Sequence, residues 1–98
     1  MGERGFREVL EMGLTRSEFV RLLPVAIGRG EARLTNDSLR GTWEGLDWRL
    51  TIAERPSRRI AQLSVPVLEV VLDFPGAAPA RARPLVERFL RAYQRAGG

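Results

Sequence analysis

Glu69 and Asp73 form the best candidate pair in this sequence for general acid–base chemistry. The chain has no histidine, lysine or cysteine, so proton transfer at neutral pH would rest on carboxylates or on Tyr93. The two acids lie on the same side of an expected strand, about 13 Å apart at about 3.3 Å per residue. Even inverting glycosidases keep their carboxyl groups within about 9.5 Å of each other. We therefore expect ion pairs with strand arginines, no catalytic residue and no enzyme.

Nucleophiles, cofactor motifs and metal ligands also lack the neighbours they need. Ser17, Ser38, Ser57 and Ser64 have no histidine or lysine to activate them. Gly28-Arg29-Gly30 is too short for a phosphate-binding loop and follows a helical pattern instead of a strand. Without cysteine and histidine there is neither a disulfide framework nor a zinc ligand set. The sequence predicts no cofactor and no metal.

Three arginines, Arg55, Arg58 and Arg59, surround Pro56 and Ser57. One interpretation makes them a binding site for phosphate or for an acidic partner. The other makes them the charged corner of a hairpin, where proline and serine form the turn and the arginines stay in solvent. We favour the corner, because the whole surface is rich in arginine.

The carboxyl-terminal segment carries the entire net charge of the chain. All sixteen basic residues are arginine, and residues 81–98 hold five of them against Glu87 alone. Arg88, Arg91 and Arg95 share one face of an expected helix, which is suited to a nucleic acid, an anionic membrane surface or an acidic protein. The alternative is a solvated face that complements the dipole at the end of the helix.

The length of 98 residues and the apolar fraction of 44% predict a single globular domain spanning residues 1–98. No apolar run approaches the roughly 18 to 20 residues that cross a bilayer. Residues 1–5 lack the pattern of a signal peptide. We expect a cytoplasmic protein without a membrane span.

A helix is predicted to begin at Thr15, because Thr15 and Glu18 match a capping box. Apolar residues then recur at helical spacing until Gly28 and Gly30, which end the helix. Residues 1–13 are expected to be either a short helical turn or a frayed extension.

From Ser38 the apolar period changes to two, which predicts strands. A four-residue turn at 44–47 would place Trp43 opposite Trp48, as a cross-strand core pair more readily than as a platform for nucleic-acid bases. A second turn at 55–58 would then pair Ile52 with Ala61.

The apolar alternation reverses phase near Pro66, where a bulge or an edge position would tolerate proline. In the predicted register, residues 67–74 have no partner strand, although such an apolar strand needs one. Residues 31–35 folding back, a longer connection or a second chain would supply it. We favour a homodimer, with the candidate dimer strand formed by Val67, Glu69, Val71 and Asp73.

A break at residues 75–79 precedes the last helix, which is expected to begin near Pro84. The fold class is therefore α+β, in two layers. Its expected order is helix, three-stranded antiparallel sheet, helix, with both helices on one face of the sheet.

Two stretches, PSRRIAQLSVPVLEVVLDF and FLRAYQRAGG, resemble a group of short uncharacterised proteins of proteobacteria over residues 14–98. The resemblance implies no activity and no functional residues. The ending Gly97-Gly98 is similar to the tail of ubiquitin-like and sulfur-carrier proteins, but glycines that end a helix explain it better.

Two functions compete at this point. The first is a binding or assembly module that acts through protein–protein contacts and is itself a homodimer. The second is a nucleic-acid binder that uses the arginine face of the last helix together with the 55–59 corner. A carrier protein with a reactive terminal glycine is a remote third.

Overall fold

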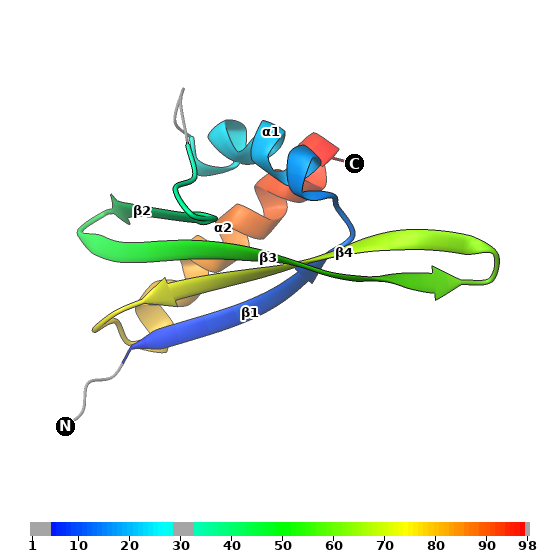
Figure 1. The fold of residues 1–98 in the computed structure, drawn as a ribbon. Coiled ribbons are helices and arrows are strands. Elements are labelled where there is room, and N and C mark those ends of the chain that lie inside the picture. Colours follow the sequence, from blue (N-terminus) through cyan, green and yellow to red (C-terminus); the bar gives the residue numbers. More distant parts are fainter. Residues whose placement is uncertain (1–4, 29–32, 98) are drawn as a thin grey trace.

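The computed structural model describes residues 5–28 and 33–97, which form a four-stranded antiparallel sheet with two helices (Figure 1). The chain order is β1 (Phe6–Met12), α1 (Arg16–Ile27), β2 (Ser38–Trp43), β3 (Leu46–Ile60), β4 (Leu63–Phe74) and α2 (Pro79–Gly97). In the sheet the strands are ordered β1-β4-β3-β2. The α+β class is confirmed, whereas the prediction of three strands is wrong.

The fourth strand is β1, in the segment for which we expected a helical turn or a frayed extension. Phe6, Leu10 and Met12 alternate with the more exposed Arg7, Val9 and Glu11, which is the period of a half-buried strand. The partner that selects this conformation is β4, where Phe6 faces Phe74 and Met12 faces Leu68. That pairing joins segments about sixty residues apart, so local sequence does not reveal it.

The β2–β3 hairpin has a turn of two residues, Glu44 and Gly45, instead of the expected four. Both adopt positive φ angles, 50° and 78°, which suits the twist of a two-residue hairpin. Consequently Trp48 faces Gly41, and Trp43 faces Leu46 instead of Trp48. The shift is by an even number of residues, so the predicted faces are retained.

The next turn lies at residues 61–62, not at 55–58. Pro56 and Ser57 form an irregularity within the long strand β3, where the register shifts between Arg55 and Arg58. Pro66 lies opposite this irregularity, as expected for a residue that cannot donate to the ladder. Ile60 therefore pairs with Leu63, and Ile52 pairs with Val70 instead of Ala61.

Strand β4 is an interior strand, which corrects the expectation of an unpaired strand at 67–74. Its residues from Leu68 to Asp73 pair with β1 on one side and with β3 on the other. The candidate dimer residues Glu69, Val71 and Asp73 thus already have two neighbouring strands, and Val67 pairs with Arg55. The argument for a dimer through the backbone of this strand is therefore removed.

The helices begin and end largely as their caps dictate. Thr15 and Glu18 form the predicted capping box, and Gly28 ends α1 with a φ of 72°. Helix α2 begins at Pro79, five residues earlier than expected, and contains Pro84 in its second turn. Pro79 fits the first helical turn because it has no N–H to satisfy there. Pro84, in the second turn, lacks the N–H that would bond to the carbonyl of Ala80.

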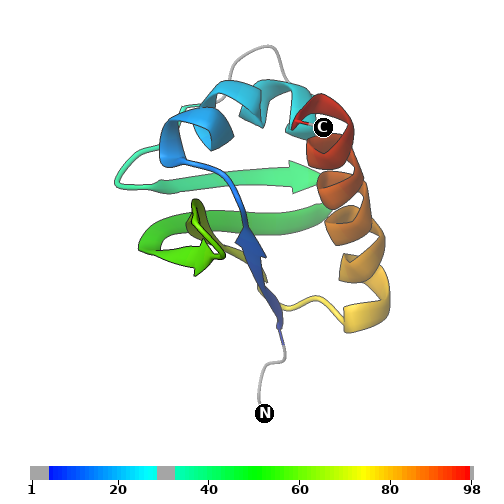
Figure 2. The ribbon, with the colours of Figure 1, turned by 90° about the vertical axis from the view of Figure 1, so that its right-hand side faces the viewer.

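One hydrophobic cluster joins both helices to the sheet. Its sheet residues occupy the even-numbered positions of β3 and β4: Leu46, Trp48, Leu50, Ile52, Leu68, Val70, Leu72 and Phe74. Helix α2 runs alongside the sheet, and α1 lies across one end of α2 (Figure 2). Among the described residues, no helix is long and apolar enough to cross a membrane.

Candidate functional site

The outer part of the β3–β4 hairpin, residues 53–67, extends beyond the body of the protein and is called the arm below (Figure 1). Strand β2 pairs with β3 only as far as Thr51, and β1 pairs with β4 only from Leu68 onward. The arm is consequently a two-stranded ribbon, and none of its residues belongs to the buried core of the protein.

The tip of the arm is apolar and exposed. Ile60 and Leu63 face each other beside the turn, and they are 54% and 68% exposed. Cross-strand partners share a face, so the pairs Ile60 with Leu63 and Arg58 with Val65 lie on one face of the ribbon. Exposed large apolar side chains in a cluster, rather than singly, are typical of contact surfaces.

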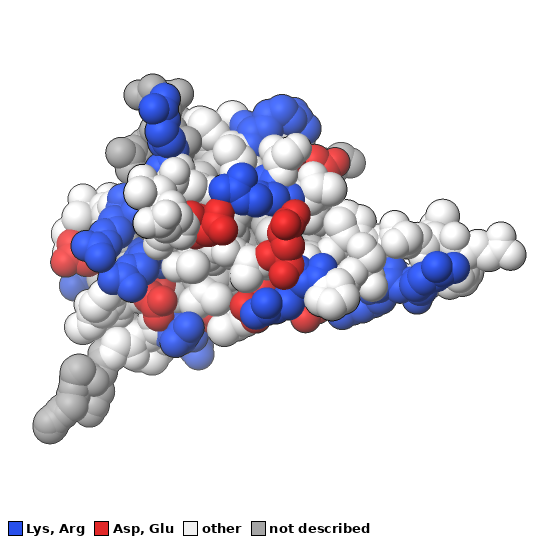
Figure 3. Space-filling model, in the orientation of Figure 1, with Lys and Arg blue, Asp and Glu red and all other residues white. Residues whose placement is uncertain are grey.

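The predicted arginine corner lies on this arm, and two of its arginines are already paired. Arg55 binds Glu69 at 2.6 Å, and Arg58 reaches across to Glu11 of β1 at 3.0 Å. Arg59, on the opposite face, has no ion pair within the part of the chain that the structure describes. Figure 3 shows blue side chains along the arm and a white tip.

The backbone edges of the arm are poorly suited to adding another strand. Pro56 and Ser57 interrupt the regular ladder of β3, and Pro66 removes a donor from β4. Proline, bulges and charged residues are the devices by which natural sheets prevent edge pairing. Contacts of the arm with a partner would therefore use side chains.

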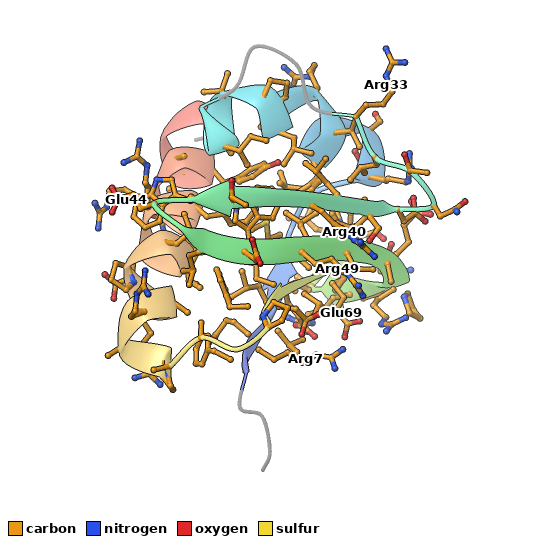
Figure 4. The ribbon with its side chains drawn as sticks, turned by 90° about the vertical axis from the view of Figure 1, so that its left-hand side faces the viewer. Arg7, Arg33, Arg40, Glu44, Arg49 and Glu69 are labelled. Carbon is orange, nitrogen blue, oxygen red and sulfur yellow. The ribbon has the colours of Figure 1, made fainter. Side chains whose placement is uncertain are left out.

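On the body, the sheet presents a row of charges on the side away from α2 (Figure 4). Arg7, Asp73, Arg49 and Arg40 face one another in that order across the four strands. Glu69 and Asp73, the carboxylates weighed for catalysis, are engaged here with Arg55 and Arg7, as the sequence predicted. Two acidic residues lie close to Arg49: Asp73 faces it on β4, and Asp47 precedes it by two residues on β3. They balance much of the charge of the arginines in this row.

The arginines of α2 lie elsewhere. The guanidinium carbon of Arg88 is 5.9 Å from the centroid of the Trp43 ring, and Arg91 lines a hollow beside Gly28 at the end of α1. The side chain of Arg95 falls outside the described residues, as does Gly98. Trp43 is next to the turn at one end of β3, while Arg58 and Arg59 are near the other end. The two arginine groups therefore do not converge into one patch.

Arg88 also borders an apolar cavity of about 220 Å³. The cavity lies between the end of α1, the body of α2 and the sheet, and Trp43 and Trp48 form part of its wall. Trp48 is 8% exposed, so it offers no platform for base stacking. Sequence reasoning identified both tryptophans as core residues but had no signal for the cavity.

The only tyrosine of the chain, Tyr93, ties the two helices together. Its hydroxyl donates a 2.7 Å hydrogen bond to the backbone carbonyl of Phe19, and its ring stacks on the Phe19 ring with 4.8 Å between centroids. Burial raises the pKa of Tyr93 well above its ordinary value of 10.0. Tyr93 therefore acts as a structural donor, with no feature of a general base.

This pKa shift predicts a loss of stability at high pH. The pKa of Tyr93 is higher in the folded state than in the unfolded state, so the neutral hydroxyl contributes its full stabilisation below about pH 10. This contribution to the free energy of unfolding falls as the pH rises further. We expect the free energy of unfolding to decrease above about pH 10, and to decrease less in Tyr93→Phe. Urea unfolding between pH 8 and 11, monitored by tryptophan fluorescence, measures both. Parallel curves for the two proteins would contradict the expectation.

No acidic cluster capable of holding a metal ion occurs among the described residues. The structure thus defines a small α+β domain with a protruding hairpin arm and a separate apolar cavity. Comparisons of the chain with protein-family models, curated proteins and solved structures give no match.

Proposed function

We propose that this protein is a non-enzymatic binding module that holds another protein through its arm. The observation that carries the proposal is the exposed pair Ile60 and Leu63 at the end of a ribbon that projects from the body. Burying each of these side chains in a partner would contribute about 1.5–3 kcal/mol. The fold itself gives them no such burial.

The arm fits a protein partner better than a nucleic acid. Arg55 and Arg58 are neutralised within the chain by Glu69 and Glu11, so few cations of the arm are available to phosphates. The arginines of α2 lie near the opposite end of β3 and cannot extend the same contact. A nucleic-acid interface typically neutralises several phosphates at once.

The partner surface that suits the tip is an apolar pocket with an acidic rim. No acidic residue occurs between positions 55 and 67, where Arg58 and Arg59 precede the tip. The chain's own cavity is bordered by the cation Arg88, so a second copy would place like charges together. We therefore propose a different protein as the main partner, and self-association remains an outcome of the test.

In this proposal both helices lie on one face of the sheet. This placement is supported by the buried cluster, in which residues of both helices pack with the even-numbered residues of β3 and β4. The other face, with its paired charges, then continues onto the side of the arm that carries Ile60 and Leu63. A partner that docks on the tip would have room to extend over this face.

Leu63 and Val25 form a matched pair for the test, because both are 68% exposed and they lie on different elements. A photo-crosslinking residue is placed at either position and activated in cells that produce the protein. We expect a discrete protein adduct from position 63 and none from position 25. The partner, once purified, should bind Ile60→Ser/Leu63→Ser at least about tenfold more weakly, and Val25→Ser with unchanged affinity.

Three results would count against the proposal. Equal binding by the tip variant and the Val25 variant would exclude the arm. Adducts made only between copies of this chain, with a doubled mass in light scattering, would replace the foreign partner with a homodimer. Nuclease-sensitive adducts, with affinity that falls steeply between about 50 and 200 mM salt, would assign the arm to nucleic acid instead.

A further inference from the structure

The cavity beside Arg88 combines an apolar wall with a single charged group. Its lining consists of Ala26, Ile27, Gly28, Trp43, Trp48, Leu50, Leu72, Phe74, Leu85, Arg88 and Phe89. Apart from Arg88, none of these side chains carries a charge. Small-molecule sites are typically apolar pockets in which a few polar groups fix the orientation of the ligand.

Arg88 lines this cavity and also a neighbouring hollow, which Val25 and Arg91 border; Ala26 and Gly28 are likewise common to the two. Neither hollow is lined by an acidic residue. The nearest acids in sequence, Glu87 and Glu44, line neither. An anionic group at this position would meet one guanidinium directly and a second one close by.

We propose that this cavity binds a small carboxylic acid, with the apolar body inside and the carboxylate on Arg88. An apolar cavity of about 150 Å³ is enough for a benzene ring. The volume of about 220 Å³ therefore accommodates one six-membered ring or a short branched chain. The carboxylate is favoured because a guanidinium binds it with two parallel hydrogen bonds.

A purely structural role for Arg88 is the competing explanation. Helix α1 has no basic residue in its last turn, and Arg88 and Arg91 lie beside its end at Gly28. A cation there stabilises the helix dipole. This role requires no ligand, so binding measurements separate the two explanations.

The two tryptophans of the chain both line the cavity, which makes their fluorescence a direct reporter. Cyclohexanecarboxylate and cyclohexylmethanol are suitable probes, since they share one ring and differ in charge. We expect a saturable emission change with the acid, with a dissociation constant of about 1 mM or below, the range open to a ligand of this size. The alcohol should bind about tenfold more weakly or worse.

Variants assign the effect to the cavity and to Arg88. Arg88→Gln should lower the affinity for the acid to that for the alcohol and leave the alcohol unchanged. Ala26→Leu fills the cavity and should abolish binding of both probes, while Thr42→Ala, outside the cavity, should alter neither. Circular dichroism confirms that each variant is folded.

The proposal is overturned if neither probe gives a saturable change, or if acid and alcohol bind equally and Arg88→Gln has no effect. It is also overturned if emission changes with protein concentration alone and Leu63→Ser removes that change. The last result would assign the cavity to the arm of a second copy.

Discussion

Replacing Phe19 with alanine is expected to lower the free energy of unfolding by about 3–5 kcal/mol. Phe19 is fully buried and stacks on Tyr93 with an angle of 5° between the rings. Phe89 adds a tilted contact at 6.3 Å. The substitution leaves a cavity at the point where α1 meets α2.

Urea unfolding followed by tryptophan fluorescence measures this effect. For a domain of this size, each kcal/mol corresponds to about 4–8 °C in Tm. The matched control is Val25→Ala on the same helix, where the side chain is 68% exposed, and we expect a change within about 0.5 kcal/mol. A loss below about 1 kcal/mol for Phe19→Ala would mean that the aromatic stack does not hold α1 in place.

The second large effect is expected at Gly41. A Cβ atom there would lie 2.5 Å from Cζ2 and 2.8 Å from Cε2 of the Trp48 indole, well inside the usual carbon contact of about 3.5–4.0 Å. Trp48 is nearly buried and must move away from β2. Gly41→Ala should destabilise the protein by about 1–3 kcal/mol.

A double-mutant cycle tests whether Trp48 is the cause. Trp48→Leu removes the ring that the new Cβ would meet, so Gly41→Ala should cost less in that background than in the original protein. Because Trp48 also borders the cavity, its displaced ring should occupy part of that space and weaken probe binding. Equal costs of Gly41→Ala in both backgrounds would show that the strand, and not the ring, sets the requirement for glycine.

Local signals in the sequence were sufficient for α1 and for the faces of the central strands. Thr15 and Glu18 are three residues apart and form their cap by themselves. The alternation around Trp48 and Leu50 determines which side chains face the core, and it survives an even shift in register. Such features depend on neighbours in sequence, which is why the pattern alone reveals them.

The hairpin arm was missed because its turn has no sequence signature. Proline, serine and arginine at 55–58 are typical of a turn, but the chain tolerates them as a bulge in a long strand. The actual turn begins at Ala61, which adopts a φ of 56° although alanine rarely does. The exposed tip follows from this placement and was therefore not foreseen.

The remaining errors concern contacts between distant segments. Strand β1 pairs with residues about sixty positions away, and the cavity is lined by parts of α1, α2 and the sheet. Neither can be read from spacing or composition. The prediction that Glu69 and Asp73 pair with strand arginines was confirmed, because arginines on the same face of the sheet were available to them.

The interior position of β4 depends on seven residues near the start of the chain. If β1 detached, the backbone of β4 from Leu68 to Phe74 would become a free edge, and exposed apolar edges are sites of aggregation. Two molecules at high concentration would then have a route to strand exchange, in which each donates its β1 to the other. The stability of the sheet against strand exchange therefore depends on β1 remaining paired with β4.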